Sequence, residues 1–246
     1  MIRFVVAVQL NFAAREVAIK LVYYGPALSG KTTNLKALHE MVHAGSRGRL
    51  MTLETKDDRT LFFDMLPLVF KAESESGSMS LRVKVFTVPG QVVHASTRRL
   101  VLQGADGVAF IADSQVAETA NNADAFLDLR ANLRDLGRSL SEVPLVIQFN
   151  KRDLPNVRTD AEIDELARRG KEPVYKACAT NGEGVLESFF GLLERSWRRL
   201  DKEHDLAHKL GVGPEAFLEM AAASLGHAGK ASALSRACVG GDKRIP

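Results

Sequence analysis

Cysteine is scarce in this chain: Cys178 and Cys238 are its only two, and they lie far apart in the sequence, outside any motif. Such sparse usage favours a reduced compartment over a disulfide-stabilised secreted fold. Two isolated cysteines also cannot assemble a zinc site. We therefore expect a cytoplasmic protein without a structural metal.

Long apolar runs are missing as well, since no segment approaches the ~20 consecutive apolar residues that a membrane-spanning helix needs. The apolar run from Phe4 to Leu10 follows a single Arg3 and is similar to a short signal peptide. We interpret it instead as an extra strand or as the mark of an upstream start codon. The second residue is Ile2 and the chain ends Lys243-Arg244-Ile245-Pro246. Neither myristoylation nor prenylation is therefore expected.

Charge of one sign is not in excess, because the formal net charge is only +3 over 246 residues. Basic pairs are scattered at 98–99, 168–169 and 198–199. Isolated pairs of this kind are typical of solvated helix faces rather than of a nucleic-acid surface. We expect no nucleic-acid partner.

Glycine, in contrast, marks a functional loop. Residues 25–32 read GPALSGKT and fit the pattern G-x-x-x-x-G-K-[ST], between a predicted strand and a predicted helix. Backbone N–H groups of such a loop point at phosphates, Lys31 reaches the β- and γ-phosphates, and Thr32 holds Mg²⁺. We expect the nucleotide phosphates to be bound by Gly25, Ala27, Leu28, Ser29, Gly30, Lys31, Thr32 and Thr33.

The base is predicted from a second motif, N-K-x-D at 150–153, which follows the apolar run 143–149. Asp153 can accept two hydrogen bonds from guanine N1–H and N2–H. Adenine lacks this donor pair and would leave the carboxylate unpaired. A backbone amide in the Cys178-Ala179 turn is expected near guanine O6. The predicted ligands are therefore GTP and GDP, bound by Asn150, Lys151, Asp153, Cys178 and Ala179.

Alternating apolar segments predict an α/β fold with a mostly parallel sheet covered by helices on both faces. A polar loop is expected at 71–80. We expect strands near 17–24, 50–55, 81–88, 107–113, 143–149 and 173–178, and helices near 31–43, 118–138, 159–169 and 184–201.

Several segments, in order and with compatible spacing, resemble the bacterial Ras-like small GTPases of the MglA type, which are associated with gliding motility and cell polarity. The resemblance covers roughly residues 12–200 and implies a P-loop NTPase fold of the Ras-like kind. It rests on residues 23–26 (YYGP), 30–34 (GKTTN), 58–64 (DRTLFFD), 87–91 (TVPGQ) and 150–155 (NKRDLP).

The resemblance also implies roles for the switch residues. Gln91 would orient the attacking water, and the Gly90 N–H would sense the γ-phosphate. Thr60 would complete the Mg²⁺ shell, with Thr55 as an alternative. Arg59 would act as an arginine finger in cis, unless it is only a surface arginine. The implied partners are a small roadblock-fold dimer, which stimulates hydrolysis, and polarity or motility effectors.

Two departures from the usual pattern leave two functions open. Thr87 stands where most small GTPases have the aspartate of D-x-x-G, as in the MglA type. Ala27 stands where a glycine is usual, and its methyl group would crowd the γ-phosphate. The chain is then either a slow GTP hydrolase that works as a switch or a hydrolysis-deficient GTP-binding scaffold.

The expected domain organisation has three parts. Residues 1–11 form an N-terminal extension or extra strand, residues 12–201 form the GTPase domain, and residues 202–246 form a C-terminal extension. Within the extension, a polar helix is expected to continue to Leu210 and a helix to begin near Pro214. That second helix is expected either to pack on the domain or to dock a partner. Residues 228–246 are small and polar and are expected to be disordered.

Overall fold

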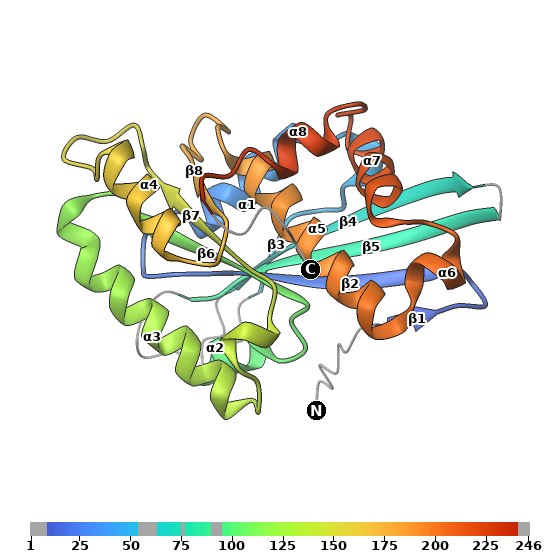
Figure 1. The fold of residues 1–246 in the computed structure, drawn as a ribbon, viewed down its shortest axis with the longest axis horizontal. Coiled ribbons are helices and arrows are strands. Elements are labelled where there is room, and N and C mark those ends of the chain that lie inside the picture. Colours follow the sequence, from blue (N-terminus) through green and yellow to red (C-terminus); the bar gives the residue numbers. More distant parts are fainter. Residues whose placement is uncertain (1–8, 54–62, 75–76, 90–94, 241–246) are drawn as a thin grey trace.

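The sheet follows the predicted α/β pattern in a computed structural model that describes residues 9–53, 63–74, 77–89 and 95–240. Its order is β3-β4-β5-β2-β6-β7-β8, and β1 pairs with β2. The strands from β5 to β8 in this order are parallel, whereas β1, β3 and β4 pair antiparallel (Figure 1). The strands are β1 (Gln9–Asn11), β2 (Glu16–Tyr24), β3 (Met51–Leu53), β4 (Phe63–Ser74), β5 (Gly77–Thr87), β6 (Gly107–Asp113), β7 (Leu145–Asn150) and β8 (Val174–Lys176).

Helices cover both faces of the sheet and enclose two apolar cores. One core joins the sheet to α1, α5 and the C-terminal helices, and the other joins it to α2, α3 and α4. This two-sided arrangement confirms the predicted fold class. The helices are α1 (Lys31–Met41), α2 (Ala95–Leu102), α3 (Thr119–Asp135), α4 (Asp160–Arg169), α5 (Val185–His204), α6 (Leu206–Leu210), α7 (Pro214–Ser224) and α8 (Ala231–Ser235).

The prediction of a loop at 71–80 is wrong. β4 and β5 form one antiparallel hairpin that stays paired out to Ser74 and Gly77 (Figure 1). β4 and α2 were also absent from the expected elements. The polar composition misled because an antiparallel ladder satisfies its backbone groups through the partner strand, whatever the side chains are.

Residues 228–240 are folded where disorder was expected over 228–246, and residues 241–246 lie outside the described residues. The helix does not continue through residue 210, because Asp205 adopts a left-handed conformation (φ 56°) between α5 and α6. α8 forms within the segment expected to be disordered, and Val239 pairs with Val174, the first residue of β8. α7 packs against α5 and β4. The division of the chain at residue 201 stays a prediction.

Among the residues that the structure describes, none of the helices combines the length and the hydropathy that a membrane span requires.

Candidate nucleotide-binding site

The loop between β2 and α1 has the backbone shape that a phosphate cradle needs. Gly25 has φ 149° and Gly30 has φ 94°, values that side-chain-bearing residues rarely adopt. A Cβ at Gly30 would lie 2.2 Å from Asn150 Nδ2, and a Cβ at Gly25 would lie 2.2 Å from Ile111 O. Both glycines are therefore required by space as well as by conformation. Leu28 is 88% exposed at the tip of the loop.

Lys31 begins α1 and is buried in the loop. Its Nζ donates to Gly25 O (3.0 Å) and Pro26 O (2.5 Å). Burial, with a smaller contribution from Arg98, lowers the pKa of Lys31 to about 8. The buried Ser29 hydroxyl has no hydrogen-bond partner among the residues described. An ammonium group and an unpaired hydroxyl at a helix N-terminus fit an incoming phosphate.

The low pKa of Lys31 predicts that nucleotide affinity depends on pH. Bound phosphates favour the charged amine and raise its pKa, so nucleotide binding takes up a proton once the free amine is neutral. Affinity is therefore nearly full at about pH 7, is halved near pH 8, and is lower by roughly sevenfold at about pH 8.8. Titration of fluorescent GDP across this range measures the change, below the pH at which guanine N1–H ionises. A pH-independent affinity would contradict the assignment.

Asp64 joins three threonines at the mouth of the loop. Asp64 lies in β4 and accepts hydrogen bonds from Thr32 Oγ1 (2.6 Å), Thr52 Oγ1 (2.8 Å) and Thr87 Oγ1 (3.2 Å). The Asp64 backbone N–H also donates to Thr87 Oγ1 (2.9 Å). The carboxylate thus lies beside Thr32, the hydroxyl that is expected to hold Mg²⁺.

Sequence reasoning missed the role of Asp64. It lies 32 positions from Thr32 along the chain, and the DRTLFFD run that ends on it carries no spacing that points to the loop. The one available signal was Thr87, since a threonine in place of the usual aspartate leaves the metal site one carboxylate short.

The second motif closes the other end of the site. Asn150 ends β7, and its Nδ2 donates to Ser29 O (2.9 Å) while its Oδ1 accepts from the Ala179 N–H (3.0 Å). Asn150 therefore ties the phosphate loop to the turn after β8. Ala179 lies in the turn from which a backbone amide is expected to meet guanine O6, and its own N–H already donates to Asn150.

The rest of the motif lies beside Asn150. Lys151 has φ 66° and forms an ion pair with the buried Asp113 (2.6 Å). Asp153 is exposed and lines a cavity at this end of the site. The Cys178 thiol lies 3.1 Å from the Thr180 hydroxyl.

Two cavities form one cleft along these residues. A cavity of about 410 Å³ is lined by Lys31, Thr32 and Asp64, and one of about 230 Å³ is lined by Asn150 and Asp153. They share Leu28, Gly30 and Thr33. The cleft lies at the carboxyl ends of parallel strands, where open α/β sheets bind ligands.

A buried polar cluster connects this site to the helices behind it. Tyr24, directly before the loop, donates its hydroxyl proton to Asp128 on α3 and accepts from Asn132 (3.0 Å). Arg98 on α2 forms an ion pair with Asp128 (2.8 Å). β2, α2 and α3 are thus held together just below the phosphate loop.

The predicted switch residues cannot be placed. Arg59, Thr60, Gly90 and Gln91 lie outside the described residues, as does the alternative Thr55. Their roles stay predictions.

Comparison with curated proteins agrees with this geometry. The chain is 44% identical over 179 residues to the mutual gliding-motility protein MglA of Myxococcus xanthus, an alignment that covers 73% of this chain and 90% of that protein. The chain belongs to the MglA family of Ras-like GTPases. This result confirms the predicted family and the GTPase class, whose members bind guanine nucleotides.

More distant relatives point the same way. The MglA-family chain is 26% and 25% identical, each over 172 residues, to ADP-ribosylation factor-like protein 6 of Caenorhabditis briggsae and of Caenorhabditis elegans. These alignments cover 68% of this chain and 80% of each relative. No protein-family model matches the sequence.

Proposed function

We propose that this chain is a cytoplasmic GTP-binding switch that hydrolyses GTP slowly and binds partners in its GTP state, in the control of motility or polarity. The observation that carries the proposal is the pair of adjoining cavities, one lined by Lys31 and the other by Asp153. The relative in Myxococcus xanthus is named for mutual gliding motility, and the same process is proposed for this chain.

The cleft fits a nucleotide with Mg²⁺ on its phosphates. Thr32 would hold the ion directly, Thr60 would join it by resemblance, and Asp64 would accept hydrogen bonds from water on the ion. The bound ion would neutralise phosphate charge and orient the phosphates. Thr32 donates its hydroxyl proton to Asp64, which leaves the lone pairs of the hydroxyl oxygen available to hold the ion.

Asp64→Asn tests this role. The amide keeps the shape but removes the charge that an outer-shell carboxylate offers, so Mg²⁺-dependent GTP affinity is expected to fall about 10- to 100-fold. Affinity measured with EDTA should change much less. Mg²⁺ titration of fluorescent GTP binding separates the two effects. The matched control is Asp135→Asn. Asp135 is an exposed aspartate at the distant end of α3, where it pairs with Arg99 of α2. This variant should leave the titration unchanged.

Hydrolysis is proposed to depend on Gln91 and Arg59. Gln91 would orient water for in-line attack on the γ-phosphorus, Gly90 would donate its N–H to a γ-phosphate oxygen, and Arg59 would neutralise charge that develops there. Supplying an ordered arginine and glutamine is worth about 10³–10⁵ in rate, or roughly 4–7 kcal/mol of barrier. A roadblock-fold dimer is proposed to order these residues by contacting the switch segment that runs from residue 59 to residue 70.

Single-turnover phosphate release, with and without the roadblock dimer, tests this mechanism. Stimulation is expected for the native chain and is expected to vanish in Arg59→Ala and in Gln91→Leu. Full stimulation of Arg59→Ala would exclude an arginine finger in cis.

The second candidate function, a hydrolysis-deficient scaffold, rests on Ala27. If its methyl group is the obstruction, Ala27→Gly raises the stimulated rate. No stimulation of either the native chain or Ala27→Gly would favour the scaffold.

A further inference from the structure

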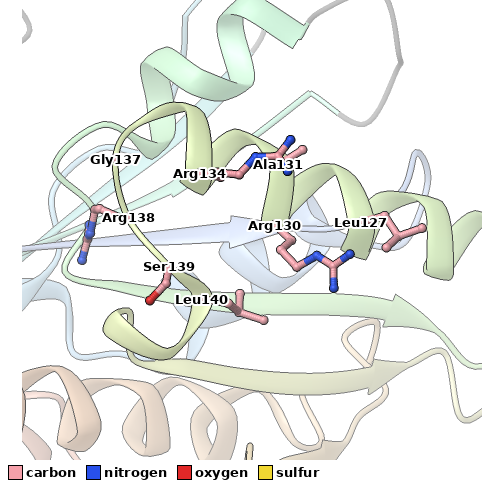
Figure 2. Close-up of a pocket in the computed structure, with 8 residues that line it drawn as sticks. All are labelled: Leu127, Arg130, Ala131, Arg134, Gly137, Arg138, Ser139 and Leu140. Carbon is pink, nitrogen blue, oxygen red and sulfur yellow. The ribbon is translucent and has the colours of Figure 1, made fainter.

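A cavity of about 650 Å³ lies away from the nucleotide cleft and shares none of its lining residues. It is formed by the C-terminal half of α3 and the turn that follows (Figure 2). Figure 2 shows Leu127, Arg130, Ala131 and Arg134 on the helix, and the turn that carries Leu140 folding back beneath it. The established family activity gives this cavity no role.

The helix lines the cavity with one continuous stripe. Leu127, Arg130, Ala131 and Arg134 are spaced i, i+3, i+4 and i+7, so they share a face. The neighbouring face of α3, which includes Leu133, is buried against the sheet. Leu127 is 51% exposed. The side chain of Leu127 thus offers apolar surface that the domain does not cover, and the small side chain of Ala131 lies next to it on the stripe.

The guanidinium groups on this stripe are not neutralised. Neither Arg130 nor Arg134 forms an ion pair or side-chain hydrogen bond within the described ranges. Arg138, at the end of the cavity, donates to the carbonyl oxygen of Ala105 (2.6 Å). Two arginines at i and i+4 repel each other, so their placement costs stability unless an anion joins them.

Nearby carboxylates do not supply that anion. Asp135 pairs with Arg99 (3.3 Å). Glu142 accepts from the Ser139 backbone N–H (2.6 Å), in a capping box. The two free guanidiniums therefore face the solvent beside an apolar hollow.

We propose that this cavity docks an acidic, amphipathic peptide segment of a protein partner. Carboxylates of the segment would pair with Arg130 and Arg134, because guanidinium binds carboxylate in a two-pronged geometry. An apolar side chain of the segment would enter between Leu127 and Leu140, and such buried anchors carry much of the affinity at interfaces.

The charge favours a protein over the other anionic partners. A nucleic-acid site gains its affinity by neutralising many phosphates, whereas this cavity offers two free guanidiniums. An anionic membrane gains only about 1 kcal/mol per basic residue, so two would hold the chain weakly. Neither partner would use the apolar hollow.

Peptide binding tests the proposal. The probe is a fluorescein-labelled peptide of about 12 residues with glutamates and leucines at helical spacing, titrated with the GDP-loaded full chain. We expect saturable binding. Arg130→Glu/Arg134→Glu should weaken it about tenfold or more, since a lost ion pair becomes a like-charge contact. Changing every glutamate of the peptide to glutamine, or every leucine to serine, should lower its affinity for the native chain to the same extent.

The matched control is Arg168→Glu/Arg169→Glu, which makes the same charge change on α4, where both arginines pair with Glu165. It should bind the probe as the native chain does. GDP affinity should be unchanged in both double variants, which shows that the chain is folded.

Three results would overturn the proposal: no peptide binding, equal weakening by both double variants, or equal binding of the serine peptide. Vesicles of phosphatidylglycerol and a DNA duplex are the remaining probes. Binding to either that is lost only in Arg130→Glu/Arg134→Glu would assign the cavity to that class of partner instead.

Discussion

Asparagine in place of Asp153 is expected to lower the affinity for GTP by about 10⁴- to 10⁵-fold, the range over which a site built to hydrogen-bond its ligand rejects a mismatched one. The carboxylate is predicted to accept from guanine N1–H and N2–H. An amide would present a donor to the N2 amino group, and the two donors would face each other unpaired. Xanthine carries an oxygen at this position, so Asp153→Asn should bind xanthosine triphosphate better than the native chain does.

Displacement of fluorescent GDP by GTP, xanthosine triphosphate and ATP measures this change in base preference. Asp135→Asn is the matched control, because Asp135 is an exposed aspartate at the end of α3 with the same charge and pairs with Arg99, away from the N-K-x-D motif. It should keep the native preference. Equal affinity of the native chain for ATP and GTP would remove the guanine assignment altogether, as would undiminished GTP binding by Asp153→Asn.

Much of this site was predictable because its chemistry is local in the sequence. The phosphate loop depends on glycines at fixed positions, and the structure shows why: a side chain at Gly25 or Gly30 would collide with Ile111 or Asn150. The contact between Asn150 and Ser29 is long-range, yet each residue belongs to a motif that can be recognised alone.

The parts that were missed depend on pairing across the sheet. Asp64 reaches Thr32 only because β4 lies antiparallel to β5, in a register that brings Asp64 next to Thr87 at the end of β5. No local pattern encodes that register. The C-terminal strand pairing of Val239 with Val174 is another case, since it joins residues from opposite sides of α5 in the sequence.

The segment that carries α8 was misjudged because its composition is small and polar, although it follows directly on α7, the helix expected from Pro214, and packs on the same side of α5. The surface that receives α7 and α8 is aromatic. Phe217 on α7 stacks on Trp197 of α5 with ring centroids 3.8 Å apart and an interplanar angle of 8°. Both side chains are almost completely buried. Tyr175 of β8 donates its hydroxyl proton to Ser235 O (2.8 Å) and so holds the end of α8.

Phe217→Ala is therefore expected to lower the free energy of unfolding by about 3–5 kcal/mol, as for other buried phenylalanines truncated to alanine. The loss combines the transfer of the ring, its stacking on Trp197 and the cavity that remains, since Leu210 and Ala221 belong to the same core. Urea denaturation of the GDP-loaded chain, followed by tryptophan fluorescence and by circular dichroism, measures it. Trp197 is the single tryptophan of the chain and reports directly on this contact.

Phe12→Ala supplies the comparison, because Phe12 is 42% exposed and contacts only the Lys209 ammonium, 5.0 Å from its ring, among the contacts described for its side chain. Phe12→Ala should lower the free energy of unfolding by about 1 kcal/mol or less. A similarly small loss for Phe217→Ala would mean that the C-terminal helices fold apart from the domain. Fluorescence and circular dichroism transitions that separate in this variant would carry the same meaning. Coincident transitions with the large loss would show that α7 belongs to the cooperative unit that contains β4 and Asp64.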